Sequence, residues 1–398
     1  MSPVLTRIAA MAACLILSGC SLFPSPETLV TAPQANVQAS GNRDRQQIAQ
    51  PFIPPGYRLI AGQHQDNLPA VSQFDVDGDG VPELLCTIAS KTNGYNGGFF
   101  ALKKIGAQWK KMFELTGEAA SVYSFTQADL IGDGKKELLV SYFVGGSAGE
   151  SVVAYSWQNP TLRPLASVMA NRLELEDMPD KVGKRDGKSE LGIWIKDTGT
   201  FYIVDVLRYE NGRFVPAEDV YPYYFKKVAS YYESLSSGNG QESKSVKSPL
   251  LYYYLADAYV KADEYQKALA VCDRARREFP AKEVSPAQQS YIENLTIVRG
   301  IALIGTGSFK EAEKILQPLA DKRTTPGAGQ PAAFPTILEA AYYMGKAAQG
   351  QHEDAKARAC YNQVLLMAKK TIDPYDKAQQ ERWVEKSRQA LQKLSPLK

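Results

Sequence analysis

A short loop is repeated three times in the first half of the chain at a nearly constant spacing. Each copy has Asp-Gly followed, after two further residues, by Glu-Leu, and an apolar run comes next. The glycines of the three copies are Gly80, Gly134 and Gly187, which lie 54 and then 53 residues apart. A period of about 50 residues marks a repeated supersecondary unit, so this half of the chain is restricted to a tandem architecture.

Residues 56–221 follow a β pattern within this period, because short apolar runs rich in aromatic and β-branched residues alternate with turn signals. Three units are fewer than the blades of a typical closed propeller. We therefore predict a partial β-propeller-like array of three four-stranded units. The predicted strands are Glu83–Ala89, Gly98–Ile105, Trp109–Leu115 and Val122–Ala128 in the first unit, Glu137–Val144, Ser151–Trp157 and Leu162–Met169 in the second, and Glu190–Ile195, Thr200–Tyr209 and Arg213–Pro216 in the third.

Residues 249–398 follow a helical period instead. Two helices joined by a short turn are predicted first, and Pro280 ends the second of them. Small and aromatic residues recur at similar places in two further copies, and the pattern resembles tetratricopeptide (TPR) repeats. The resemblance implies an α-helical, TPR-like solenoid, so the predicted fold class is multidomain, β and then α. The residues that carry it are Tyr252, Leu255, Ala256, Tyr259, Tyr265, Ala268, Ala275 and Pro280, then Gly300, Leu303, Gly307, Phe309, Ala312 and Leu316, then Gly350, His352, Ala355 and Tyr361.

Residues 222–248 are predicted to connect the two halves. Their first part has aromatic residues at helical spacing, among them Tyr224 and Tyr231, and their second part is a Ser/Gly/Lys-rich flexible linker. We expect the helix to dock the halves together and to cover an exposed edge of the β array.

The N-terminus has the pattern of a secretory signal. Arg7 precedes an apolar run that is too short to span a bilayer, and Leu17-Ser18-Gly19-Cys20 follows. This tetrad resembles the lipobox of bacterial lipoproteins, which implies a signal peptide over 1–19, lipid attachment at Cys20 and a disordered tether over 20–55. The predicted location is extracytoplasmic, lipid-anchored to a bacterial membrane. The alternative is an ordinary signal peptide with an incidental cysteine.

The first repeated loop has the composition of a cation site. Carboxylates stand at positions 1, 3, 5 and 9, and position 7 adds a backbone carbonyl; hard oxygen ligands of this kind suit Ca²⁺. The loop resembles those of FG-GAP/VCBS repeats, which implies one structural Ca²⁺ here. The alternative is a metal-free turn in which the carboxylates accept backbone N–H bonds. The predicted ligands are Asp75, Asp77, Asp79, Val81 and Glu83.

The other two loops have lost ligands. The second keeps Asp129 and Asp133 but has Ile131 at the third position, and the third has Lys184 at a ligand position. We therefore expect a single Ca²⁺ site in the chain.

Catalytic patterns are weak, and we predict that the chain is not an enzyme. The G-x-S-x-G match at 145–149 is expected to be a hairpin turn, since the next residues alternate as a strand. The stretch 183–189 is one residue short of a phosphate-binding loop, and the chain has only two histidines. The formal net charge is +3, and the surplus of basic residues over 249–398 is too small and too scattered to indicate a nucleic-acid partner.

The predicted function is that of a protein-binding scaffold in the cell envelope. A concave face of helical repeats suits a peptide or protein segment, and the groove candidates are Tyr252, Tyr253 and Tyr259, for which core packing is the other interpretation. The alternative function is recognition of a glycan or cell-wall polymer by the β-repeat domain, which would need exposed aromatics on loops, such as Tyr95.

Overall fold

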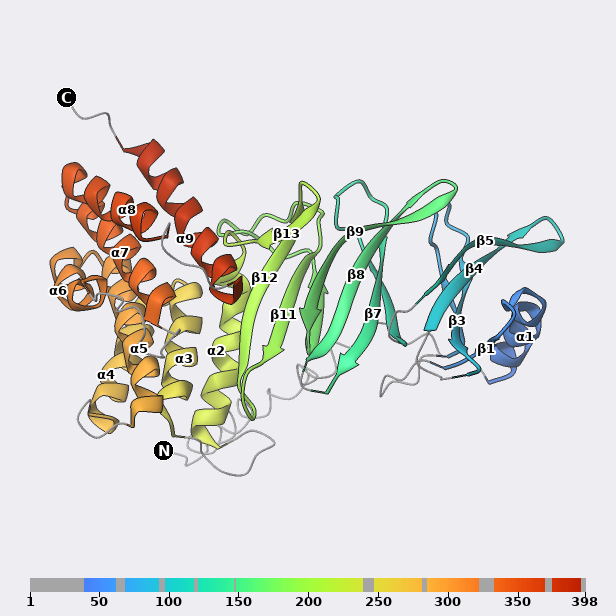
Figure 1. The fold of residues 1–398 in the computed structure, drawn as a ribbon, viewed down its shortest axis with the longest axis horizontal. Helices are drawn as coiled ribbons and strands as arrows, with labels where there is room; N and C mark the ends of the chain where they lie inside the picture. Colours follow the sequence, from blue (N-terminus) through green and yellow to red (C-terminus); the bar gives the residue numbers. More distant parts are fainter. Residues whose placement is uncertain are drawn as a thin grey trace, which may run out of the picture.

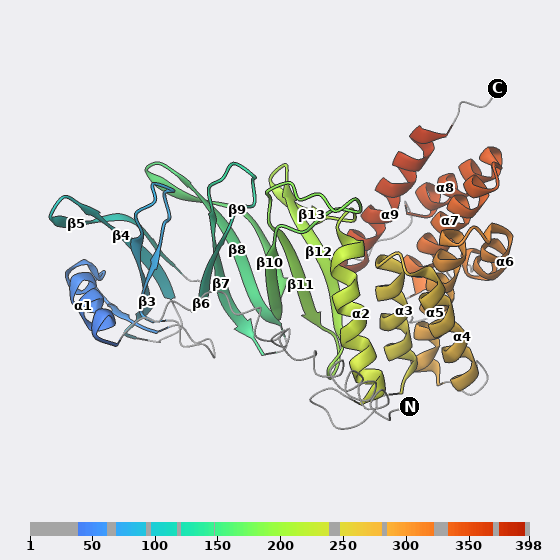
Figure 2. The same ribbon diagram turned by 180° about the vertical axis from the view of Figure 1, so that it is seen from behind.

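Three antiparallel β-sheets stand in a row, and a group of helices continues the row at one end, in the computed structural model of the chain (Figure 1). Helix α1 (Ala39–Ala49) covers the opposite end. The view from behind shows the same order, from α1 through the sheets to α2 (Tyr221–Ser237) and the helices beyond it (Figure 2). The sheets do not close into a ring, so the fold is an open β array followed by an α region, as the sequence predicts.

The structure describes residues 39–61, 69–92, 97–117, 121–146, 148–238, 247–280, 285–321, 333–368 and 374–394. The predicted signal peptide, the lipidation site Cys20 and the loop residue Tyr95 lie outside these residues. None of the described helices is both long enough and apolar enough to cross a membrane.

The first sheet has the order β1-β3-β4-β5, and β2 pairs with the same edge of β3 as β1 does. The second and third sheets are simple meanders in chain order. The strands are β1 (Tyr57–Leu59), β2 (Val71–Phe74), β3 (Glu83–Ser90), β4 (Gly97–Ile105) and β5 (Gln108–Thr116); β6 (Val122–Ala128), β7 (Glu137–Gly145), β8 (Gly149–Gln158) and β9 (Thr161–Ala170); and β10 (Arg172–Glu176), β11 (Glu190–Lys196), β12 (Tyr202–Glu210) and β13 (Arg213–Pro216).

The strand that follows each Asp-Gly loop is buried on both faces. Successive side chains of a strand point to opposite faces, and on β3 Leu84 packs toward α1 while Leu85 packs toward the second sheet. On β7, Leu138 packs toward the first sheet and Leu139 toward the third. A strand between two layers buries both of its faces, which explains why the runs after the loops are mainly apolar, with only small polar residues such as Thr87 and Ser141 among them.

The predicted grouping of strands is wrong by one strand. The sequence places Val122–Ala128 in the first unit, but this strand, β6, pairs with β7 and opens the second sheet. In the same way β10 opens the third sheet, and β2 precedes the loop of the first. Each loop therefore joins two paired strands within a sheet. A repeat period sets the spacing of the units but not the point at which a unit begins.

Part of the predicted tether is folded. Helix α1 and the 3₁₀ turn η2 (Gln50–Phe52) lie within the range 20–55. The segment is mostly polar, but Ile48, Ala49 and Phe52 pack on the outer face of the first sheet. A few well-placed apolar residues are thus enough to cover the end of the array.

Helix α2 packs on the outer face of the third sheet, not along an edge as the sequence predicts. The indole N–H of Trp194 donates to the Tyr224 hydroxyl at 2.7 Å. Gly192 lies beneath the Tyr224 ring, and a Cβ there would come within 2.4 Å of the ring carbon that carries the hydroxyl. The glycine therefore lets the helix lie close against the sheet, and the two halves share one continuous core.

Three helical hairpins and a last helix follow α2 in the described part of the chain. The turns of the hairpins have the same construction, because Asp263, Gly307 and His352 all have positive φ angles and the next residue donates its N–H to a carbonyl five residues back. This is the Schellman ending of a helix. The helices are α3 (Pro249–Lys261), α4 (Tyr265–Glu278), α5 (Pro286–Gly305), α6 (Phe309–Ala320), α7 (Ala333–Gly350), α8 (Asp354–Ala368) and α9 (Pro374–Lys393).

Glycines bring the helices of the second and third hairpins together. A Cβ on Gly300 would come within 2.7 Å of Leu316, and one on Gly345 within 2.4 Å of Tyr361. The two glycines are 45 residues apart, as are the side chains that cover them, so this close approach repeats with the turns.

Candidate functional site

The three Asp-Gly loops are built on local carboxylate-to-backbone hydrogen bonds. In the first loop, Asp75 Oδ1 accepts from the N–H of Gly78 at 2.9 Å, and Oδ2 accepts from that of Gly80 at 3.0 Å. Asp129 of the second loop accepts from Gly132 and Gly134 in the same way. The first carboxylate of each of these loops is therefore engaged by the turn itself, as the metal-free interpretation expects.

The glutamate of each loop is buried and is bonded to the loop backbone. Glu83, Glu137 and Glu190 are at most 3% exposed. Each accepts one backbone N–H, from Val76 at 2.8 Å, from Leu130 at 2.9 Å and from Met178 at 2.8 Å, respectively. Burial raises the pKa of all three carboxyl groups above the usual value, and these amide bonds oppose the rise. The repeated glutamate thus closes the loop onto the start of the next strand.

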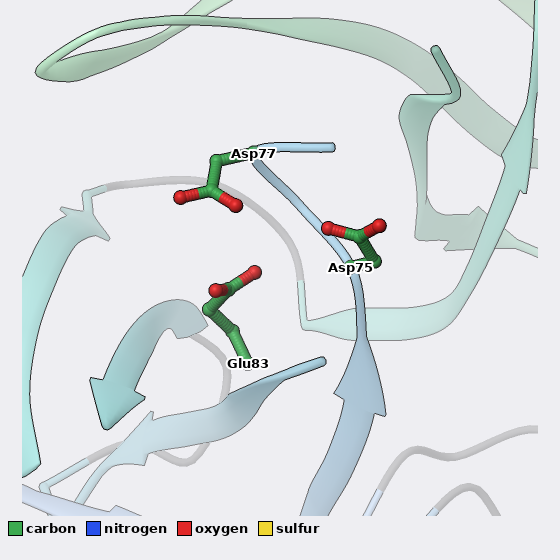
Figure 3. A group of neighbouring side chains, drawn as sticks. All are labelled: Asp75, Asp77 and Glu83. Carbon is green, nitrogen blue, oxygen red and sulfur yellow. The ribbon is translucent and has the colours of Figure 1, made fainter. Parts of the chain in front are cut away.

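Three predicted ligands of the first loop do come together. Asp75, Asp77 and Glu83 each offer an oxygen, and these atoms lie within 4.8 Å of one another (Figure 3). Such a cluster has the spacing to hold a cation. The other two predicted ligands lie at the exposed side of the loop, where Asp79 accepts the N–H of Val81 at 2.8 Å.

A cationic group of the chain already reaches this cluster. Lys103 of β4 places its Nζ 2.5 Å from Asp77 Oδ2 and 2.5 Å from Asp79 Oδ2, and 3.2 Å from Glu83 Oε1. Burial by itself would lower the pKa of the Lys103 ammonium, but the bonds to the carboxylates outweigh it and raise that pKa. The same contact lowers the pKa of Asp79. The ammonium supplies the positive charge that the sequence assigns to a metal ion.

The position of Lys103 follows from strand register. Leu84 of β3 lies opposite Leu102 of β4, so Glu83 lies opposite Lys103. The same register places Arg208 opposite Glu190 in the third sheet, where Arg208 Nε donates to Glu190 Oε1 at 2.7 Å. Sequence reasoning missed both cations because it searched for ligands within the loops. In both sheets the basic residue lies near the end of the second strand that follows the loop, in β4 and in β12. A basic residue at this position is the signal that would have found them.

The second sheet lacks such a cation at this position. Leu138 lies opposite Tyr155, so Ser156 takes the place of the lysine and the arginine. The charges that bear on Glu137 are those of Asp133 and Asp129, and both raise its pKa further. The three units therefore share the buried glutamate, but only the first and third place a basic side chain beside it.

The predicted groove tyrosines have different environments. Tyr252 and Tyr259 are buried at 1% and 5% exposure, and their hydroxyls bond Glu278 and Glu233, respectively. Tyr253 is half-buried on the neighbouring surface of α3. Of the three, Tyr253 is the one that is only partly buried, although it also packs against the core, and its binding role stays a prediction.

The G-x-S-x-G match begins at the last residue of β7, Gly145, and ends at the first residue of β8, Gly149, and its Ser147 lies outside the described residues. A strand follows the match, where the nucleophile motif of hydrolases requires a helix.

No protein-family model matches the chain, and no curated protein matches it. Among solved structures, the chain is similar to the crystal structure of a TPR-like protein from Chlorobium tepidum, with 22% identity and a TM-score of 0.28. The match covers 36% of this chain and 93% of that one. The helical hairpins of this chain share the construction of their turns, and two of them share a close glycine contact.

Proposed function

We propose that the chain is a non-catalytic, lipid-anchored extracytoplasmic scaffold that binds a protein partner through its helical repeats. The observation that supports the proposal is a set of half-buried aromatic and acidic side chains on the first helices of the first and third hairpins. Tyr253 and Asp257 lie one turn apart on α3, and Glu339 and Tyr343 lie one turn apart on α7. Helix α5 packs against both of these helices. We call these four residues the inner helix face.

The chemistry of the inner helix face suits a basic partner segment. Burial, and after it the neighbouring Asp257 carboxylate, raise the pKa of Glu339 to about 7, while Arg382 and Lys261 act against the rise. A lysine or arginine of a partner would restore the charged form of Glu339 and lie against a tyrosine ring. A basic peptide segment is therefore the occupant that we propose for this face.

A pulldown from envelope extract with the full-length chain tests this function. Glu339→Lys should abolish retention of the partner, because it places a positive charge where the proposed partner has one. Glu353→Lys is the matched control, since Glu353 is exposed in the α7–α8 turn outside this face. Equal retention by both variants would rule out the inner helix face, and competition by soluble cell-wall polysaccharide would favour the glycan alternative.

The proposed lipid anchor has its own test. Cys20→Ser should move the protein from the membrane fraction to the soluble fraction and should remove labelling by a palmitate analogue. Unchanged membrane association and labelling would show that the lipobox resemblance is misleading.

For the first loop, we propose that Ca²⁺ binds only when Lys103 is displaced. Asp77, Asp79 and Glu83 all contact the Lys103 ammonium, so a divalent ion and this ammonium would compete for the same oxygens. The competition makes the wild-type loop a weak Ca²⁺ site, and substitution of Lys103 should expose it.

A further inference from the structure

A cleft of about 1390 Å³ lies between the last β-strand and the last helix. One wall is β13, and the other is α9 over residues 380–389, with Leu365 and Ala368 of α8 beside it. Four consecutive residues, Arg213 to Pro216, line the cleft. Because successive side chains of a strand point to opposite faces, a cavity that touches all four must run along the backbone edge of the strand.

Strand β13 is an edge strand whose outer backbone groups can be assigned. It is joined to β12 by Asn211-Gly212, both with positive φ angles, so Glu210 and Arg213 form the hydrogen-bonded pair next to the turn. Hydrogen-bonded pairs alternate along an antiparallel ladder, and the bond from the Ala217 N–H to the Val206 carbonyl continues this alternation. Arg213 and Val215 therefore direct their backbone groups at β12.

The outward groups are the N–H and C=O of Phe214 and the C=O of Pro216. Among the described residues, β13 has β12 as its sole strand partner. The cleft thus presents one donor and two acceptors in the spacing of a β-ladder.

We infer that the cleft binds an extended segment of a partner protein as an additional strand on β13. An extended chain is the occupant that satisfies an exposed ladder edge, since its own N–H and C=O groups alternate with the same period. The four residues of β13 span about 13 Å at 3.3 Å per residue, and ten residues of α9 span about 15 Å at 1.5 Å per residue. The cleft accordingly accommodates four or five extended residues.

The opposite wall specifies an apolar residue in this segment. Leu365, Ala368 and Val384 are half-buried side chains of α8 and α9 that line the cleft. Several charged groups that line the cleft are paired within the chain. Lys386 and Arg382 bond Glu218 at 2.6 Å and 3.1 Å, and Asp219 bonds Arg208 at 3.0 Å. The segment is therefore recognised by its backbone and by one apolar side chain, not by its charge. The cleft uses residues outside the inner helix face, so the inference stands apart from the proposed function.

Hydrogen exchange of the free full-length chain provides the first test. The Phe214 amide should exchange much faster than those of Arg213 and Val215. A Phe214 amide that is already protected would show that the chain fills its own edge, and protection that grows with protein concentration would show that a second copy does so. Either result overturns the inference.

Selection of a phage-displayed library of random twelve-residue peptides on the full-length chain provides the second test. Selected peptides should protect the Phe214 amide, and N-methylation of the one peptide residue that pairs with it should weaken binding about tenfold. Ala368→Trp should abolish binding by filling the cleft, and Leu366→Trp should leave it unchanged because Leu366 is exposed outside the cleft. Peptides that bind both variants equally, or a library that yields none, would contradict the inference.

Discussion

The first and second Asp-Gly loops differ in the side chain that lies opposite their buried glutamate, and that side chain belongs to neither loop. Both have a buried glutamate that accepts a loop N–H, at 2.8 Å in Glu83 and 2.9 Å in Glu137. The glutamate of the first loop faces the ammonium of Lys103, whereas that of the second faces Ser156. The comparison teaches that the loop is held by its glutamate in both units, and that a basic residue beside the glutamate is not required for this fold of the loop.

The largest expected effect comes from removing the cation of the first loop. Lys103→Met leaves three carboxylates close together, and we expect a loss of about 3 kcal/mol in the stability of this loop. The Val76 amide, which bonds Glu83, should show the loss by hydrogen exchange. Millimolar Ca²⁺ should recover part of the protection in the variant and should leave the wild type unchanged.

The neighbouring Lys104 provides the control for this experiment. Lys104 is exposed, and Lys104→Met should alter neither the exchange of the Val76 amide nor the response to Ca²⁺. If Lys103→Met were as stable as the wild type in the presence of a chelator, the ammonium would have no structural role. If calorimetry showed wild-type protein binding Ca²⁺ as well as the variant, the competition would be absent.

A smaller effect is expected from adding a cation to the second loop. Ser156→Lys places an ammonium opposite Glu137, as in the first sheet, and should stabilise the loop by about 1 kcal/mol. The readout is slower exchange of the Leu130 amide, which bonds Glu137. Ser151→Lys, at the other end of β8, is the matched control, and equal effects of the two substitutions would argue against a specific ion pair.

The smallest effect is a pH dependence of the second loop. Burial raises the pKa of Glu137 above its usual value near 4.5, so the folded chain holds this proton more tightly than the unfolded chain. The resulting stabilisation is fully present below pH 4.5 and is lost as the pH rises through the folded-state pKa. Protection of the Leu130 amide should therefore fall between pH 4 and neutral pH.

Glu137→Gln removes the titrating group and should flatten this pH profile. Ser156→Lys should also flatten it, because an ammonium lowers the pKa of a neighbouring carboxyl group. A profile that keeps its slope in Glu137→Gln would assign the pH dependence to another group.

Much of the architecture was accessible from sequence because it depends on periodicity. The repeated loop predicted a tandem β region, and the helical period from Pro249 onward predicted the α region; both are confirmed. The sequence did not show which strand begins each β unit. Strand β6 belongs to the second sheet because its pairing with β7 closes the loop between them, and pairing is a contact that no local pattern specifies.

The candidate cation site shows the same division. The sequence by itself determined that Asp75, Asp77 and Glu83 lie in one tight loop, because alternate residues of such a loop direct their oxygens inward. Only the tertiary structure decided that Lys103 reaches them, since strand register carries a residue twenty positions away to the side of Glu83. A loop motif shows which oxygen ligands are available. The charged side chain that contacts these ligands depends on which strand pairs beside the loop.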